Sequence, residues 1–432
     1  MNSLRPPEED RQSAELDPAL FRHEAGRMVV ALTRLFGVHN LALAEDVVQD
    51  AFCRAIEVWK FRGVPANPSA WLMATAKHRA VDILRRERTA RTYAPELTRM
   101  IESEWTLVPT IHEVFAAHAI QDDELRMMFS CCHPRLNEPA QVALILNILC
   151  GFSVNEVAAA FFSSRAATEK RIVRGKKVLA ASKRLFEFTS SDLSKRLSAV
   201  QRALYLLFNE GYHGACEESA VRTELCREAM RLTALLLAHP LASTPATHAL
   251  GALMCFNAVR LPERVDAAGN LKPLAEQDRT RWDVALLHEG QRLLESSATG
   301  DQISEYHVEA AIAFLHASAP SNEATDWPTI ITLYSTLLTI RPSPIVALNR
   351  AIAVAQLHGP KRGLEAIAAI PDRARLAGYP FYFAALGELE LSDGHPEAAR
   401  PHLHAALNLA RNPAERQFLR QRLAACQDSA RC

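Results

Sequence analysis

Hydrophobic positions along this chain recur at spacings of three and four residues, and alternating strand patterns are scarce. This periodicity predicts helices in almost every segment, and therefore an all-α fold. Stretches rich in Pro, Ser, Gly and Asn mark the breaks between helical blocks. They predict a loose tail at 1–18, small helical domains at 19–92 and 119–188 joined by a linker at 93–118, a helical extension at 189–320 and helical repeats at 321–427.

Residues 151–184 have the pattern of a helix-turn-helix. Ser153 and Glu156 form a capping-box pair for a first short helix, and Ser164 can cap a second one. The residues of the second helix expected to face inward are Thr168, Ile172, Gly175 and Leu179. Cations occupy the neighbouring stripe. A helix that is apolar on one side and cationic on the other is suited to a DNA major groove.

Two helices of opposite charge are predicted nearer the N-terminus. The first spans 44–59, with a buried stripe of Val48, Phe52, Ala55 and Trp59. Its opposite face carries Asp46, Gln49, Asp50, Cys53 and Glu57. A Pro-containing loop separates it from a helix at 71–88, which is apolar early and strongly basic late.

The last block contains a repeat. The segments 346–357 and 381–391 read as first helices, and 362–369 and 396–409 as second helices. Ala366 and Ala399 are equivalent in this register, which gives a period close to the 34 residues of a tetratricopeptide repeat. Such units bury their faces by stacking and present a groove to a peptide or another domain. A plain antiparallel helix bundle is the alternative.

Charge is unevenly distributed, although the net charge is zero. Residues 60–99 hold nine Lys and Arg against three acids, and residues 163–186 hold eight against one. Two cationic islands on a compensating acidic body suit a polynucleotide-binding protein. The composition, 49% hydrophobic and 23% charged, is that of a soluble globular protein, and no apolar run is long enough to cross a membrane. Nine scattered cysteines and a start unlike a signal peptide favour a cytoplasmic location.

Three motifs in this order resemble the extracytoplasmic-function sigma factors of bacterial RNA polymerase: AEDVVQDAF, WLMATAKHRAVDILRRER and GFSVNEVA…RIVRGKKVL. They cover roughly residues 20–188. FSCCHPRLNEPAQVAL, LFNEGYHG, EQDRTRWD, TDWPTIITLY and RPSPIVALNRAIAVA resemble the subgroup with a long tetratricopeptide-like C-terminal extension. Gly175 departs from the family, which usually carries Ala there, and a mid-helix Gly costs about 1 kcal/mol relative to Ala.

The resemblance implies a transcription initiation subunit that is not an enzyme and needs no cofactor or metal. Its partners would be core RNA polymerase, through the clamp helices of the largest subunit and the flap, promoter DNA, and a regulatory protein or peptide on the extension. The implied polymerase-binding residues are Glu45, Asp46, Gln49 and Asp50. The implied region 2 DNA contacts are Arg62, Asn67, Trp71, Lys77, His78, Arg79, Arg85 and Arg86. The implied region 4 DNA contacts are Ser164, Arg165, Ala167, Thr168, Glu169, Lys170, Arg171, Arg174, Lys176 and Lys177. Among these, Trp71 is also read as a core residue, and Thr168 is the least secure because it is expected to face inward.

Two other classes of protein stay open. An operator-binding regulator with a tetratricopeptide sensor needs only the helix-turn-helix. A metal-dependent enzyme could use Cys131 and His133 or the cluster 209–213. A structural zinc site needs four ligands, however, and no CxxC occurs, so half-buried core thiols are the alternative reading of Cys131 and Cys132. A helix end stopped by Gly explains the cluster 209–213 equally well. The polar run 278–283 fits either an interdomain ion-pair network or a face that packs on the sigma domains.

Overall fold

The structure is a computed structural model that describes residues 18–37, 40–90, 117–160, 163–181, 190–213, 221–266, 270–410 and 412–429. These residues form helices and no strand, apart from an isolated antiparallel bridge between Val265 and Leu271, which confirms the all-α prediction. Most of the expected tail and linker lie outside the described residues. No described helix is both long enough and apolar enough to span a membrane.

The contacts divide the chain into two compact units. The first unit comprises 1–158 and 164–200, and the second comprises 159–163 and 201–432. The two predicted N-terminal domains therefore fall almost entirely within one unit. The two predicted C-terminal segments share the other.

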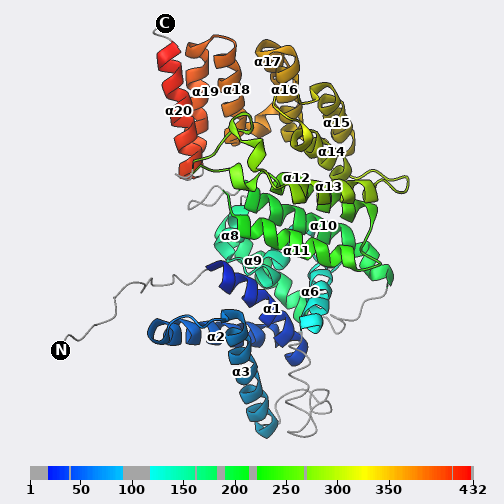
Figure 1. Cartoon of the computed structure of the whole chain (residues 1–432). Helices are drawn as coiled ribbons and strands as arrows, with labels where there is room; N and C mark the ends of the chain where they lie inside the picture. The colour runs from blue at the N-terminus through cyan, green and yellow to red at the C-terminus, as the bar shows by residue number, and fades with distance from the viewer. Residues whose placement is uncertain are drawn as a thin grey trace, which may run out of the picture. The chain divides into compact units, whose positions relative to one another are not determined.

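In Figure 1 the helices of the first unit run in colour from blue to green. They are α1 (Pro18–Phe36), α2 (Leu41–Arg62), α3 (Pro68–Ala90), α6 (Ala117–Cys131), α7 (Glu138–Leu144), a π-helical turn (Ile145–Leu149), α8 (Val154–Ala160), α9 (Arg165–Ala180) and the first half of α10 (Ser190–Tyr212). Helix α1 packs against α2 and α3 on one side and against α6 and the π-helical turn on the other. It is the element that joins the two predicted domains.

Close approach of two backbones defines this junction. A Cβ atom placed on Gly26 in α1 would lie 1.9 Å from the carbonyl oxygen of Leu149. Leu149 ends the π-helical turn, in which the N–H of Cys150 donates to the carbonyl of Ile145 (3.2 Å). The wider turn brings the Leu149 carbonyl against α1, and only a residue without a side chain fits there.

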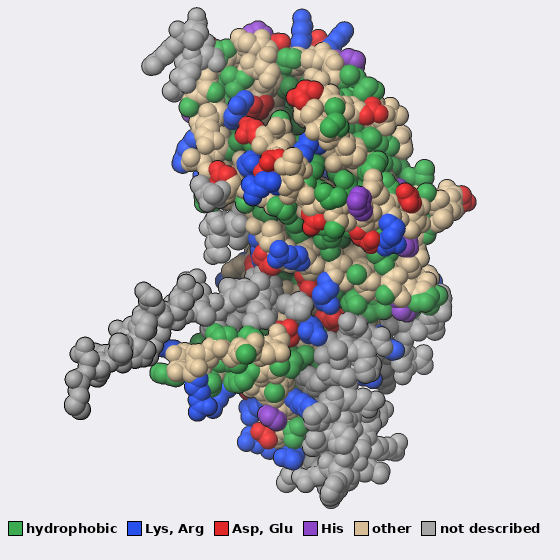
Figure 2. Space-filling model, viewed as in Figure 1, with side chains coloured by type: hydrophobic (Ala, Val, Ile, Leu, Met, Phe, Trp, Pro, Cys, Tyr) green, Lys and Arg blue, Asp and Glu red, His purple; other side chains and the backbone are tan. Residues whose placement is uncertain are grey.

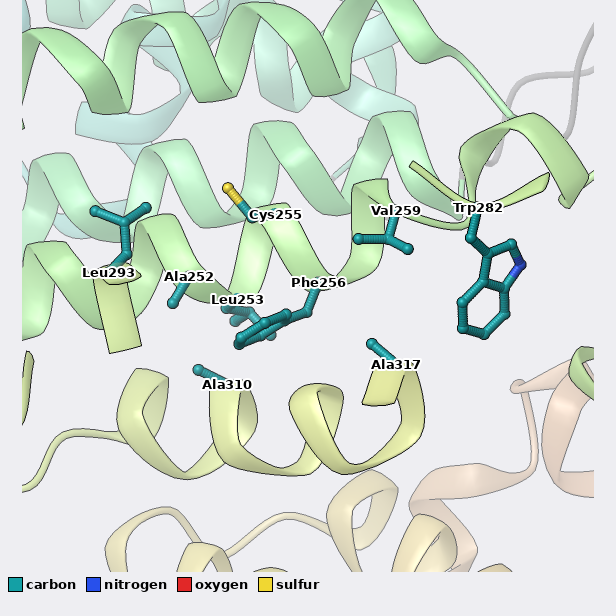
Figure 3. Close-up of a cluster of buried hydrophobic side chains, with 9 residues drawn as sticks. All are labelled: Ala252, Leu253, Cys255, Phe256, Val259, Trp282, Leu293, Ala310 and Ala317. Carbon is teal, nitrogen blue, oxygen red and sulfur yellow. The ribbon is translucent and has the colours of Figure 1, made fainter. Parts of the chain in front are cut away.

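The second unit begins with the second half of α10 and contains a core formed by α12, α13 and α14 (Figure 3). Its helices are α11 (Thr223–Ala238), α12 (Pro245–Ala258), α13 (Val284–Ser297), α14 (Glu305–Ser318), α15 (Trp327–Ile340), α16 (Pro344–His358), α17 (Pro360–Ala368), α18 (Pro380–Ser392), α19 (Pro396–Leu409) and α20 (Pro413–Ser429), with short 3-10 turns at Leu261–Glu263, Leu274–Glu276, Arg279–Arg281 and Arg373–Leu376. From α14 to α20 each helix packs on the next along the chain (Figure 1). Helices α16 to α19 occupy the positions predicted for the two helix pairs, within two residues at each end.

We expect Gly26→Ala to destabilise the first unit by about 1–3 kcal/mol. The added methyl group would overlap the backbone oxygen of Leu149, which cannot move away as a side chain could. Helix propensity alone predicts the opposite, a gain of about 1 kcal/mol. The measurement is the free energy of unfolding in urea. Gly378→Ala is the matched control, since its added Cβ would meet no atom within 4 Å. A Gly26→Ala chain as stable as the parent would contradict the packing of α1 on the π-helical turn.

Candidate nucleic-acid interface

Helix α9 is positioned by a buried stripe and a capped start. Its buried residues are Thr168, Ile172, Gly175 and Leu179, the inward set predicted from the sequence. The Ser164 hydroxyl accepts a hydrogen bond from the N–H of Ala167 (3.3 Å), as predicted for an N-cap. The capping box before α8 is also present, because the N–H of Ser153 donates to the Glu156 carboxylate (2.8 Å) and the N–H of Glu156 donates to the Ser153 hydroxyl (3.3 Å).

The outer face of α9 carries most of the candidate region 4 contacts. The exposed members are Ser164, Arg165, Ala167, Glu169, Lys170, Arg174 and Lys177, and the half-buried members are Arg171 and Lys176. Thr168 is the exception. It is fully buried, so it faces the core of the first unit and cannot also reach a base edge, and its place among the DNA contacts was wrong.

The predicted acidic face of α2 is on the surface. Asp46, Gln49 and Asp50 are exposed, and Glu45 is half-buried. The opposite side of the helix is buried at Val48, Ala55 and Trp59 as predicted, whereas Phe52 is only half-buried. The helix therefore presents carboxylate and amide groups outward from a fixed apolar stripe.

Helix α3 carries the candidate region 2 contacts. The exposed members are Arg62 at the end of α2, Asn67, His78, Arg85 and Arg86, and the half-buried members are Trp71, Lys77 and Arg79. In Figure 2 the blue Lys and Arg side chains gather over the part of the molecule that α2 and α3 occupy.

Two of these residues have structural partners as well. Asn67 accepts a hydrogen bond from the N–H of Ala70 (3.0 Å), so it caps α3. Trp71 meets the buried Trp59 edge to face, with ring centroids 5.3 Å apart, which favours the core role over base stacking. Burial also lowers the pKa of Lys77 from its ordinary value.

Ion pairs connect the candidate polymerase-binding residues to candidate DNA-binding residues. Lys176 Nζ lies 2.5 Å from Glu45 Oε1, between α9 and α2. Arg79 of α3 lies 3.1 Å from the Asp50 carboxylate. Both pairs are partly exposed, and ion pairs of this kind contribute about 0–1 kcal/mol each, so they are easily exchanged for other partners.

A third ion pair joins α1 to α6 and involves a buried carboxylate. Arg34 Nη1 donates to both carboxylate oxygens of Asp123 (3.2 Å each), and the Asp123 side chain is almost completely buried. Neither Arg34 nor Asp123 was identified from the sequence, because they are 89 residues apart and neither belongs to a motif. They meet only because α1 and α6 pack against each other.

The residue clusters suggestive of an enzyme are partly in the core: Cys131, Cys132, Gly211 and Tyr212 are buried, whereas His133, Asn209 and Glu210 are half-buried and His213 is exposed. Cys131 and Cys132 are fully buried, and burial raises the pKa of Cys131 to about 12 and that of Cys132 well above its ordinary value. Such thiols stay protonated at pH 7 and are poor nucleophiles. No group of three His, Cys, Asp or Glu side chains suited to a metal ion occurs within the described ranges. The cluster 209–213 lies at the end of α10, where Gly211 packs against the backbone of Arg222 and Cys226.

Residues of the polar run 278–283 make contacts within the second unit. Asp278 and Asp283 each accept a hydrogen bond from a backbone N–H at the start of a helical turn. Arg281 pairs with the buried carboxylate of Glu263 (2.8 Å), whereas Arg279 donates to the backbone carbonyls of His316 and Ala319. Glu263 was not identified from the sequence.

Comparison with known proteins assigns two segments of the chain. The family model for sigma-70 region 2 matches residues 20–90, which contain α2 and α3. A family of unknown function, DUF6596, matches residues 196–298.

A whole-chain relative is also found. An uncharacterised protein of Rhizobium meliloti (strain 1021) is 37% identical over 396 residues, which cover 91% of this chain and 92% of that protein. No solved structure matches. The chain therefore belongs to the family of this Rhizobium meliloti protein, and its sigma-70 region 2 domain supports a sigma factor role in transcription initiation, with core RNA polymerase and promoter DNA as partners.

Proposed function

We propose that the protein is an extracytoplasmic-function sigma factor that holds a promoter at two points and carries a regulatory, tetratricopeptide-like extension. The observation that carries this proposal is the exposed cationic face of α9, mounted on a capped helix-turn-helix that follows a region 2 domain in the same chain. An operator-binding regulator would need the helix-turn-helix alone. It would leave the region 2 match over residues 20–90 without a role.

Helix α2 would dock on a clamp helix of the largest polymerase subunit, and the helix-turn-helix would meet the flap. The exposed Asp46, Gln49 and Asp50 suit a basic partner surface, where charge sets register and the rate of encounter. The chain would have no chemistry of its own, no cofactor and no metal.

Region 2 would grip the opened strand of the downstream promoter element. The exposed Arg62, Arg85 and Arg86 suit backbone phosphates, and His78 would lie at the rim of a pocket for a base taken out of the stack. Region 4 would read the upstream element in the duplex, with Arg165, Lys170 and Arg174 toward base edges and Lys177 toward phosphate. The extension would present a groove between its stacked helices to a regulatory protein or peptide.

The deciding experiment is transcription from candidate promoters with purified core polymerase and the full chain. A promoter-specific transcript that needs the chain is expected. Failure to bind core polymerase in a pull-down, together with no transcript, would overturn the sigma factor proposal. The full chain is the right reagent because the first half of α10 belongs to the first unit, where Arg196 Nη1 donates to the carbonyl of Phe129 (3.0 Å).

We expect the variant Lys170→Ala/Arg174→Ala/Lys177→Ala to lose promoter-duplex binding while it keeps core polymerase binding. All three side chains are exposed on α9, and each lost phosphate contact should lower the slope of affinity against salt by about 1. Duplex affinity at several salt concentrations is the measurement. The control with the same charge change, Lys361→Ala/Arg362→Ala/Arg373→Ala, alters exposed cations of the second unit and should bind normally. Equal losses in both variants would show that net charge, and not α9, determines binding.

Asp46→Arg should weaken core polymerase binding at least about tenfold without reducing duplex binding, because it places a like charge opposite a basic surface. Asp46 is exposed, so the fold should tolerate the change. Competition for core polymerase with the parent chain measures the effect. Glu397→Arg, an exposed acid on α19, is the control. Undiminished competition by Asp46→Arg would remove α2 from the polymerase interface.

Lys176→Ala should weaken duplex binding less than Lys177→Ala does. The charge of Lys176 is already balanced by Glu45, whereas Lys177 is exposed and has no carboxylate within ion-pair distance in the described part of the chain. Titration of both variants at one low salt concentration provides the comparison. A larger loss for Lys176→Ala would mean that Glu45 releases this lysine to the DNA.

A further inference from the structure

Three arginines gather on the segment between α12 and α13, inside the region of unknown function. They are Arg260, Arg264 and Arg279, and they lie against two aromatic side chains. The guanidinium carbon of Arg264 is 4.3 Å from the ring centroid of Tyr212. Those of Arg279 and Arg260 are 4.7 Å and 6.0 Å from the ring centroid of Trp282. We name these five residues the arginine–aromatic cluster.

The three cations have neutral hydrogen-bond partners. Arg260 Nε donates to the side-chain oxygen of Gln277 (3.1 Å), and Arg264 Nη2 donates to the carbonyl of Tyr212 (3.0 Å). Arg279 Nη1 donates to two backbone carbonyls. Within the described residues no carboxylate lies within ion-pair distance of any of the three.

The nearest acids are engaged elsewhere. Glu263, which is buried, pairs with Lys272 and with Arg281 (2.8 Å). Glu323 is exposed and acts on Arg279 only from beyond ion-pair distance. By contrast, two half-buried arginines elsewhere in this unit have acidic partners: Arg422 forms a two-pronged pair with Glu388, and Arg341 pairs with Glu305 (2.8 Å).

Several buried donors of the arginine–aromatic cluster lack an acceptor from the described chain. They are Arg264 Nε, Arg279 Nη2, Trp282 Nε1 and the Tyr212 hydroxyl. Tyr212 and Trp282 are only 3% and 7% exposed, so their polar atoms are well removed from bulk solvent. Figure 3 shows Trp282 at one end of the apolar core, with its ring nitrogen on the side away from the other labelled side chains. Leaving such donors unpaired destabilises the folded chain.

The three guanidinium groups of the arginine–aromatic cluster repel one another when no anion is bound. Burial lowers the pKa of Arg260, and the neighbouring Arg264 and Arg279 lower it further, although Tyr212 raises it. Burial, together with Arg260 and Arg279, lowers the pKa of His316 to about 4. His316 is therefore neutral at pH 7, and the net charge of the site comes from the three guanidinium groups.

We propose that the arginine–aromatic cluster is a binding site for the phosphate group of a small phosphorylated molecule. Guanidinium groups match phosphate oxygens with paired N–H donors, and the aromatic rings hold two of the three planes in place. A phosphate monoester carries nearly two charges and three terminal oxygens, so it balances three cations and meets the unpaired donors better than a single carboxylate does.

A neighbouring cavity offers room for the organic part of such a ligand. It has a volume of about 370 Å³ and borders the cluster through His316, whose carbonyl accepts from Arg279. Trp327 and Tyr334 supply apolar wall, and Asn322, Asn349 and Gln356 supply polar groups. This size and lining are typical of small-molecule sites. The proposal is independent of the sigma factor assignment.

The test uses the full chain and inorganic phosphate or pyrophosphate, with acetate and chloride at matched ionic strength. In the parent chain both phosphates should raise the unfolding midpoint in a concentration-dependent manner, and acetate and chloride should not. The variants Arg260→Gln and Arg279→Gln should lose at least about tenfold in phosphate affinity by calorimetry. Arg292→Gln, which removes an exposed arginine paired with Glu289 on α13, should bind phosphate as the parent does.

A second measurement leaves the three arginines unchanged and covers the case in which Arg260→Gln fails to fold. The chain has five tryptophans, and in a 15N-labelled sample the indole N–H signal of Trp282, assigned by Trp282→Phe, should shift on addition of phosphate. An unmoved Trp282 signal with an unchanged unfolding midpoint would overturn the proposal. So would equal stabilisation by acetate, which would indicate a general anion effect, or unchanged phosphate affinity in Arg279→Gln.

Discussion

The contact between α1 and the π-helical turn is the constraint on which the first unit depends. Gly26 allows the α1 backbone to reach the Leu149 carbonyl, and the π-helical turn places that carbonyl outside its usual intrahelical bond. Together with the packing of α1 on α6, this approach joins α2 and α3 to the helices from α6 to α9 within the first unit. The buried Asp123 and its partner Arg34 then fix the register of the same two parts.

In this arrangement, ion pairs link the acidic face of α2 to the cationic surfaces of α3 and α9. Glu45 and Asp50, from the acidic face of α2, are each paired with a cation from a candidate DNA-binding surface. Because the pairs are partly exposed, each can be exchanged for a polymerase cation or a DNA phosphate at little cost. Polymerase and DNA would therefore compete with contacts inside the unit as well as with water. Under the proposed function, occupation of one surface would alter the charge available to the other.

Features set by near neighbours in the chain could be predicted from the sequence, and features set by distant ones could not. The buried stripe of α9 and the caps at Ser153 and Ser164 follow from spacing and side-chain chemistry within a few residues. The same spacing predicted that Thr168 faces inward, whereas the resemblance implied a DNA contact. Thr168 is buried, so the prediction from the spacing is the correct one. The Arg34–Asp123 pair and the Gly26 contact join residues about 90 and more than 120 positions apart, and no local signal marks them. The arginine–aromatic cluster draws on three separate segments. The sequence marks the cluster 209–213 and the run 278–283, but it gives no sign that the two meet and does not mark Arg260 or Arg264.

Helix α10 has a consequence for how this chain can be divided. Its residues before Gln201 belong to one compact unit and those from Gln201 onward to the other, so the boundary between the units falls inside a helix. A cut before Ser190 would remove Arg196 from the Phe129 carbonyl, and a cut after Tyr212 would leave that tyrosine without Arg264. Either fragment would expose an apolar helix face that the missing part normally covers. Natural exchange of C-terminal units between relatives would meet the same obstacle, which favours inheritance of the two units as a single piece.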